Sequence, residues 1–358
     1  MKKKLFLGLL AAAAVSFTAC QKDEVLNEVQ QDNAIGFGTY VGRDAQTKAT
    51  SINNAASLQT ASTTNGFGVF AYYTENDTWD PSNEQFDPNF MNNINVYYNS
   101  SAWTYYPLRY WPKSQSDKIS FLAYYPWKQN TTLNNGEITF TLSNNIPDQI
   151  DLMYNTNDNC KNLNTPDAAV SFNFGHALSR IGFQASAPAT QATPADANTN
   201  ITIKQVTLTF VENTIYTTND FNLVTKQWDP AASKYNSSKS FTWKTETDVN
   251  SESPKSSGTL QNNQFKIGAT AQGSLNKEDS YLMIPPVENA QYTIKVDYEV
   301  ETGGVVVQNT YTTPTGTITF AQGKAYSFNL KIGLTAISFD AEVTDWYVVT
   351  PLTDVSVQ

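Results

Sequence analysis

The chain has 358 residues and a formal net charge of −10; 13% of its residues are aromatic and only 16% are charged. So many aromatic residues can fill sizeable hydrophobic cores, which excludes global disorder. The negative charge, together with the lack of Lys and Arg clusters among aromatics, excludes a nucleic-acid-binding protein. By its length the chain suggests two domains.

The N-terminus has the pattern of an export signal. Three lysines at positions 2–4 precede an apolar run at 5–15, which is too short to span a bilayer. Cys20 follows a small residue, as in a bacterial lipobox, so we expect residues 1–20 to be a lipoprotein signal peptide and 21–33 an acylated tether. An ordinary secretory signal with a chance cysteine is the alternative. No later stretch is apolar enough to cross a membrane, so the acyl chains on Cys20 are the expected anchor.

Period-two alternation of apolar and polar residues recurs along the chain and predicts β-strands. In residues 201–210 the alternation slips at Lys204-Gln205, which predicts a β-bulge. Gly303-Gly304 predicts the turn of a hairpin. The predicted strands cover residues 35–41, 138–142, 201–210, 292–300, 305–311, 326–332 and 337–343.

A change in composition predicts the domain boundary. Residues 186–200 carry prolines and lack large apolar side chains, so we expect a linker there between domains at 34–185 and 201–358. Residues 234–258 read as a long loop around a short strand at Phe241 and Trp243. Residues 58–70 show no strong helix signal.

Candidate catalytic and metal-binding residues are scarce. His176, the single histidine, sits in an apolar run and is expected to be packed and hydrogen-bonded. No Gly-x-Ser-x-Gly elbow, phosphate-binding loop or calcium loop is present. We therefore predict no enzyme, no metal site and no cofactor. A pair of carboxylates for glycoside hydrolysis stays compatible with the sequence, because such a pair need only meet in space.

Two further features allow more than one interpretation. Cys160 lies in a polar, loop-like segment and has no disulfide partner if Cys20 is acylated; we favour an incidental residue over a reactive thiol. Aromatic residues crowd positions 97–127. They could stack on sugars at the cell surface, but packing in the core and corners of a sandwich is the favoured interpretation.

The same segments resemble the fimbrillin family of Bacteroidales over nearly all of the chain after the leader. The order and spacing of the motifs carry the resemblance. They are Trp103-x-Tyr105, Tyr110-Trp111-Pro112, Phe121-x-Ala123-Tyr124-Tyr125-Pro126, Asp151-Leu152-Met153-Tyr154, Phe174-x-His176-Ala177-Leu178-Ser179, Tyr281-Leu282-Met283-Ile284-Pro285-Pro286, Gly323-Lys324-x-Tyr326-x-Phe328-x-Leu330 and Val343-x-x-Trp346.

The resemblance implies an all-β fold with two transthyretin-like β-sandwich domains in tandem. It also implies export as a lipoprotein to the surface of the outer membrane and a structural role in fimbriae that support adhesion. In such a system a trypsin-like or arginine-specific protease removes the acylated N-terminus with the first strand, and a strand from another fimbrial subunit fills the open groove. The host or bacterial ligand is unspecified.

The sequence supplies candidates for each part of that mechanism. The alternatives are surface cations in a loop, a tail that is simply the last strand of the second domain, and a non-polymerising surface lipoprotein that binds glycans through exposed aromatics. The candidates are Ile35, Phe37, Thr39 and Val41 for the displaced first strand, Arg43 and Lys48 for proteolytic processing, and Val348, Val349, Leu352, Val355 and Val357 for the donor strand.

Overall fold

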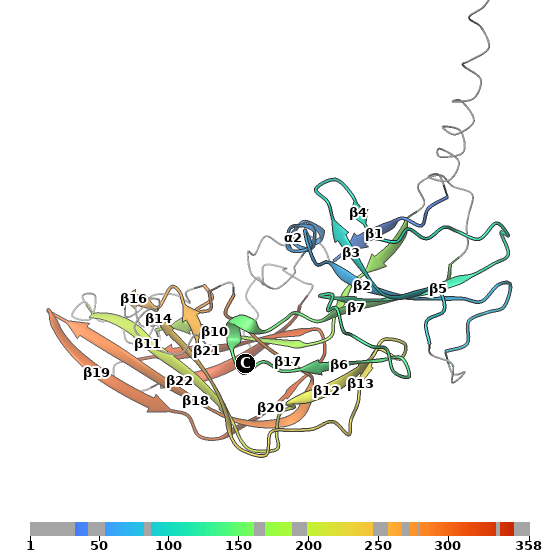
Figure 1. The fold of residues 1–358 in the computed structure, drawn as a ribbon. Helices are drawn as coiled ribbons and strands as arrows, with labels where there is room; N and C mark the ends of the chain where they lie inside the picture. Colours follow the sequence, from blue (N-terminus) through green and yellow to red (C-terminus); the bar gives the residue numbers. More distant parts are fainter. Residues whose placement is uncertain are drawn as a thin grey trace, which may run out of the picture.

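The computed structural model describes residues 33–41, 54–81, 87–160, 169–187, 199–245, 257–266, 273–277, 279–333 and 337–346. These residues form β-sheets almost throughout (Figure 1), which confirms the all-β prediction. Helical structure within these ranges is confined to α2 (Ala55–Ala61) and one 3-10 turn, η1 (Ile146–Asp148). No helix in this part of the chain is long and apolar enough to cross a membrane.

The N-terminal half is built on a six-stranded sheet with the order β4-β3-β2-β5-β7-β9. Its central strands, β2 and β5, are buried along nearly their whole length because both faces of the sheet are covered. The strands are β2 (Phe67–Tyr73), β3 (Met91–Tyr98), β4 (Trp103–Thr104), β5 (Ile119–Tyr125), β7 (Met153–Cys160) and β9 (Gly175–His176).

A two-stranded parallel sheet of β1 (Phe37–Tyr40) and β8 (Val170–Asn173) shares a core with one face of this larger sheet. Phe67, Val69 and Ala71 of β2 point into that core. The intervening Phe70 and Tyr72 point the other way, into a second core that continues through the C-terminal half. Alternate side chains of one strand thus serve two separate cores.

The C-terminal half contains a four-stranded sheet, β17-β10-β21-β22, and a seven-stranded sheet. The larger sheet has the order β15-β14-β11-β18-β19, with β16 paired to β11 and β20 paired to β18. The strands are β10 (Ser179–Ser186), β11 (Thr199–Phe210), β14 (Lys239–Thr245), β15 (Gly258–Leu260), β16 (Gln264–Lys266), β17 (Leu282–Ile284), β18 (Val287–Thr302), β19 (Val305–Thr312), β20 (Gly316–Phe320), β21 (Lys324–Ile332) and β22 (Ile337–Asp345).

Several predicted details are confirmed here. The register of β11 on β18 shifts between Ile203 and Gln205, where the bulge was expected. The β18–β19 hairpin turns at Gly303 and Gly304, with φ of 58° and 82°. Left-handed φ values at both central residues suit the two-residue hairpin turn, whose twist matches that of the strands.

The predicted boundary between the halves needs correction. β10 was assigned to the N-terminal domain, but it pairs with β17 and β21 and so belongs to a C-terminal sheet. A small sheet, β13-β12-β6, also joins the halves, since β6 (Glu137–Thr141) pairs with β12 (Thr218–Asn222), which pairs with β13 (Gln227–Trp228). Most of the predicted linker, residues 188–198, lies outside the described residues.

Three local expectations also change. α2 begins where no helix was expected: the Asn54 side chain accepts from the Ser57 backbone N–H at 2.8 Å and caps its N-terminus. The strand expected around Phe241 and Trp243 is β14, an interior strand of the seven-stranded sheet. Cys160 ends strand β7 and does not lie in a loop.

Candidate functional site

The predicted first strand fills the core of the N-terminal half. Ile35 and Val41 are 1% exposed and Phe37 is 6% exposed. The Phe37 ring stacks on Phe172 with centroids 5.6 Å apart and meets Phe121 edge to face at 5.9 Å. It also contacts the ring of Tyr105 at 5.2 Å. The apolar half of this strand is therefore part of the core itself.

The backbone of this segment is held on both sides. On one side β1 pairs in parallel with β8, and Val170 donates its N–H to the Gly36 carbonyl at 2.8 Å. On the other side Ile35 donates to the carbonyl of Arg109 at 2.9 Å. The hydroxyl of Tyr105 donates to the Ile35 carbonyl at 2.9 Å. The stretch before β1 thus lies between β8 and the loop at 105–111.

Sequence reasoning missed the role of that loop. Trp111 donates its N–H to the carbonyl of Asn33 at 3.0 Å, and the Asn33 amide donates back to the Trp111 carbonyl at 3.1 Å. These partners are 78 residues apart in the chain, so no local pattern identifies them. The aromatic crowding around Tyr105 was the one available signal.

Two contributions to the free energy determine how firmly the first strand is held: the burial of its apolar side chains and the cost of an unsatisfied hydroxyl. Burial of Ile35, Phe37 and Val41 contributes about 1.5–3 kcal/mol each, or roughly 5–9 kcal/mol together. Against this, the Thr39 hydroxyl is buried without a hydrogen-bond partner, which costs about 1–3 kcal/mol. The apolar side chains therefore hold β1 in place, while one of its polar groups is poorly satisfied.

The residues predicted to be processed or acylated lie outside the part of the chain that the structure describes. Arg43 and Lys48 follow β1 in the sequence, and Cys20 precedes it, but all three lie outside the described residues. The donor-strand candidates Val348, Val349, Leu352, Val355 and Val357 lie outside them as well.

Trp346, the residue directly before the predicted donor tail, lies within the described residues. Trp346 is 5% exposed, and its backbone N–H donates to the Gly323 carbonyl at 3.1 Å. Its ring packs beside His176, and the Arg180 guanidinium lies 5.4 Å from its centroid. Burial lowers the pKa of Arg180. As expected, His176 is packed and hydrogen-bonded, because it is buried and contacts Asp151. The tail at 347–358 thus starts from a buried anchor.

The aromatic residues at 97–127 divide into two groups. Most pack into the two cores, as the favoured interpretation predicted. Tyr106 and Tyr110, however, are 86% and 43% exposed, and Leu108 between them is 45% exposed. All three belong to the loop that holds residues 33–35. A small apolar surface therefore lies on the outside of the first-strand site.

Cys160 has the properties of an inert thiol. Burial, with a smaller contribution from the charge of Asp158, raises the pKa of its thiol to about 11. Since the thiolate is the nucleophile, such a group reacts slowly near neutral pH. Among the described residues, no group of three or more His, Cys, Asp or Glu side chains could hold a metal ion.

Comparison with known proteins identifies the family. The sequence profile described as fimbrillin-like matches residues 47–346, most of the chain. The chain belongs to the fimbrillin-like family. This confirms the resemblance seen in the sequence motifs and places the protein among fimbrial subunits of the cell surface.

Two relatives show how far the similarity of this fimbrillin extends. Fimbrium subunit Fim1C of Phocaeicola vulgatus is 27% identical over an alignment of 371 positions, which covers 93% of this chain and 94% of that protein. The crystal structure of a fimbrial protein from Bacteroides vulgatus superposes with a TM-score of 0.66 at 21% identity. It covers 88% of this chain and 99% of the other. The second comparison supports the fold alone.

Proposed function

We propose that this fimbrillin is a structural subunit of a surface fimbria that assembles by strand exchange and supports adhesion. In this proposal the precursor is exported as a lipoprotein acylated on Cys20. A trypsin-like or arginine-specific protease then cuts after Arg43 or Lys48, and the segment carrying β1 leaves with the lipid. A strand from the C-terminal tail of another subunit takes its place.

The observation that carries this proposal is the position of β1. It fills a core with Phe37, yet among the described strands it pairs with β8 alone. β1 is the first of the described strands and has one strand partner, so a cut between β1 and α2 would allow it to leave without displacing another described strand. Its departure removes roughly 5–9 kcal/mol of burial, comparable to the whole stability of a domain. A cut subunit therefore has a strong drive to accept a replacement.

The contacts of the first-strand site indicate what a replacement must provide. The rings of Phe121 and Phe172 would need an apolar partner, and the edge of β8 would need backbone hydrogen bonds. Strand addition to a sheet edge supplies both, with alternate side chains entering the core. The tail at 347–358 contains Val348, Leu352 and Val355 among its apolar residues, so it has the composition of such a donor.

The N-terminal residue of the subunit in isolated filaments tests the proposal. Cleavage after Arg43 leaves Asp44 as the first residue, and cleavage after Lys48 leaves Ala49. Filaments whose subunits begin before Ile35 would retain β1 and contradict the proposal. The mass of the intact subunit, measured by mass spectrometry, should match the same N-terminal residue. Agreement between the two measurements excludes an end produced during sequencing.

A second function is favoured by one observation, the exposed loop side chains Tyr106, Leu108 and Tyr110. Aromatic faces at a cell surface can stack on sugar rings, so a glycan-binding surface lipoprotein is the alternative. Binding of the uncut monomer on a glycan array, lost in Tyr106→Ala, would support it. Retention of binding in that variant would exclude this loop as the site.

A further inference from the structure

The edge strand β19 differs from the other edge strands in the described part of the protein. It ends the order of the seven-stranded sheet and has β18 as its single partner among the described strands. It is eight residues long, and its sequence from Val305 to Thr312 contains no charge and no proline. A long, uncharged edge presents unpaired backbone groups that readily pair with another chain.

The other edge strands in the described part of the chain are shorter than β19 or carry charge. β4, β9, β15 and β17 are only two or three residues long. β22 is longer, but its sequence carries Asp340, Glu342 and Asp345. Short length and charge both oppose pairing between chains. β19 has neither.

The side chains of β19 are also unusually apolar for an exposed strand. Val305 is 65% exposed, and Val306 and Val307 are each 53% exposed. They directly follow the turn of the β18–β19 hairpin, and β19 lies at the far end of the molecule from β1 (Figure 1). Three consecutive exposed valines, on an edge with no second partner among the described strands, form an apolar surface that neither β1 nor the described cores account for.

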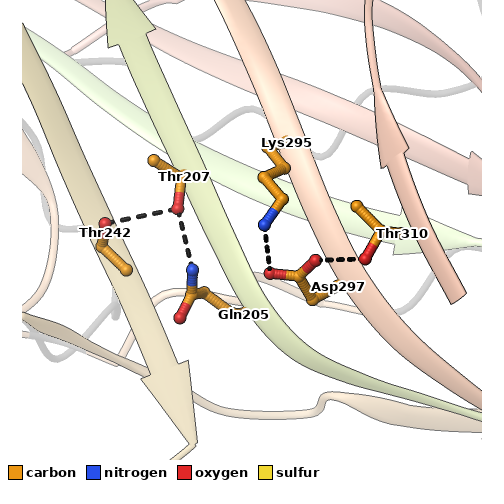
Figure 2. A network of polar contacts seen from close by, with 6 residues as sticks. All are labelled: Gln205, Thr207, Thr242, Lys295, Asp297 and Thr310. Carbon is orange, nitrogen blue, oxygen red and sulfur yellow. Dashed lines mark hydrogen bonds and ion pairs between the residues drawn. The ribbon is translucent and has the colours of Figure 1, made fainter. Parts of the chain in front are cut away.

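A side-chain hydrogen bond adds to the backbone ladder that joins β19 to β18. The Thr310 hydroxyl donates to Oδ1 of Asp297 at 2.6 Å, and the Lys295 ammonium donates to Oδ2 of the same carboxylate at 3.1 Å. Figure 2 shows these contacts beside the Gln205–Thr207–Thr242 chain on the same sheet face. The charge of Asp297 is thus paired with Lys295 of the same strand.

We propose that β19 pairs antiparallel with β19 of a second copy, so that subunits of neighbouring fimbriae associate side by side. In the register centred on Gln308, this residue faces Gln308 of the second copy. Val305 then faces Tyr311, Val306 faces Thr310 and Val307 faces Asn309. Aromatic and β-branched pairs of this kind stabilise sheets, and no charge faces another.

Charge does not oppose a second copy at this edge, despite the net charge of −10. In the cross-strand row of Gln308 the acidic residue is Glu299 of β18, which lies directly opposite it. Lys204 lies 3.9 Å from that carboxylate. Three strand spacings, about 14 Å, would separate Glu299 in the two copies. That distance exceeds the Debye length of about 8 Å, so the repulsion is screened.

The small area of the contact indicates where it acts. One strand edge offers far less than the roughly 1,000 Å² that a stable interface buries. Two isolated chains would therefore associate weakly. Many copies arrayed along two filaments would act together, and avidity would convert a weak contact into a firm one.

In the proposed pair the two Gln308 residues face each other, so charges introduced at this position test the inference on assembled filaments. Gln308→Lys places two ammonium groups opposite each other, and Gln308→Glu places two carboxylates there; each should weaken a single contact by up to about fivefold and disperse bundles seen by electron microscopy. Mixing the two kinds of filament should restore bundling. Gln291→Lys, the same change on the exposed face of β18 away from the edge, is the matched control and should leave bundles intact.

A second test does not require filaments, so its result does not depend on strand exchange. In the uncut chain carrying Cys20→Ala and Cys160→Ser, Gln308→Cys should form a disulfide-linked dimer at high concentration under mild oxidation. Asn309→Cys should not, because its side chain projects from the opposite face and meets Val307. Equal crosslinking of the two variants, no crosslinking, or bundles unaffected by Gln308→Lys would each overturn the inference.

Discussion

The indole of Trp346 lies face to face on the imidazole of His176, with ring centroids 4.0 Å apart and 3° between the planes. The other side of the pair is fixed by Asp151, whose Oδ1 lies 2.8 Å from His176 Nδ1. His176 belongs to the N-terminal sheet, whereas Trp346 directly follows β22 of the C-terminal half. The stack therefore joins the two halves immediately before the tail.

This relationship predicts a large effect of Trp346→Ala. Removing a buried tryptophan should lower the free energy of unfolding by about 3–5 kcal/mol, measured by urea denaturation. Among the described residues the indole Nε1 has no hydrogen-bond partner, so Trp346→Phe should lose no hydrogen bond and cost much less. A loss below about 1 kcal/mol in the alanine variant would contradict the anchoring role.

Most of the strands that the sequence predicted have one buried face; β19, which is largely exposed, was predicted with its hairpin turn. β11 and β18 alternate clearly because one side of each meets the core and the other meets solvent. Even the bulge at Lys204 was visible as a slip in this alternation. Residues 67–73 and 119–125 gave no such pattern, because β2 and β5 are buried on both faces.

Other features depend on distant contacts that no local pattern contains. β10 joins β21, with Ile181 opposite Tyr326, so its place in the C-terminal half could not be read from residues 186–200. Similarly, the apolar side of the first strand was predicted from alternation, but its clamp by Tyr105 and Arg109 was not. A seven-residue helix such as α2 is too short for its period to stand out.

Phe37→Ala should affect the stability of the precursor but not that of the assembled filament. Loss of this ring from the core should destabilise the uncut chain by about 3–5 kcal/mol in urea. If β1 is absent from filaments, their dissociation on heating in detergent should be unchanged. Phe183→Ala, which alters a fully buried ring of the C-terminal core, is the control and should weaken both forms. Filaments weakened by Phe37→Ala would indicate that β1 stays.

The raised pKa of Cys160 predicts slow alkylation. At pH 8 a thiol with a pKa of about 11 is ionised to about 0.1%, against roughly a quarter for an ordinary cysteine. In a Cys20→Ala chain, iodoacetamide should therefore react roughly 200-fold more slowly with the folded protein than with the urea-unfolded protein. The rate should rise with pH up to about 11. Equal rates in the two states would show that the thiol is accessible and ordinary.

Cys20→Ala tests the proposed anchor. The apolar run at 5–15 is too short to span a bilayer, so acyl chains on Cys20 should retain the precursor at the membrane. The variant should incorporate no labelled palmitate and should leave the membrane fraction. Cys160→Ser, which removes the other thiol, should be acylated as the unchanged chain is. Label in the Cys20→Ala protein would place the lipid elsewhere.

Deletion of residues 347–358 tests the proposed donor. The truncated chain keeps Trp346 and its stack on His176, so it should fold and be processed normally. It should accept a strand but be unable to provide one. Mixed with protease-treated full-length subunit, it should end growing chains and yield short capped species, seen as a low ladder in detergent gels without strong heating.

The paired control acts at the other end of the chain. Arg43→Ala with Lys48→Ala should leave β1 seated against Phe172, so that the site stays filled and the chain stays monomeric. Strand exchange requires both results, because a donor without an open site and an open site without a donor are equally unproductive. Long filaments from the truncated chain, or polymerisation of the uncut double variant, would contradict the mechanism and favour the glycan-binding monomer.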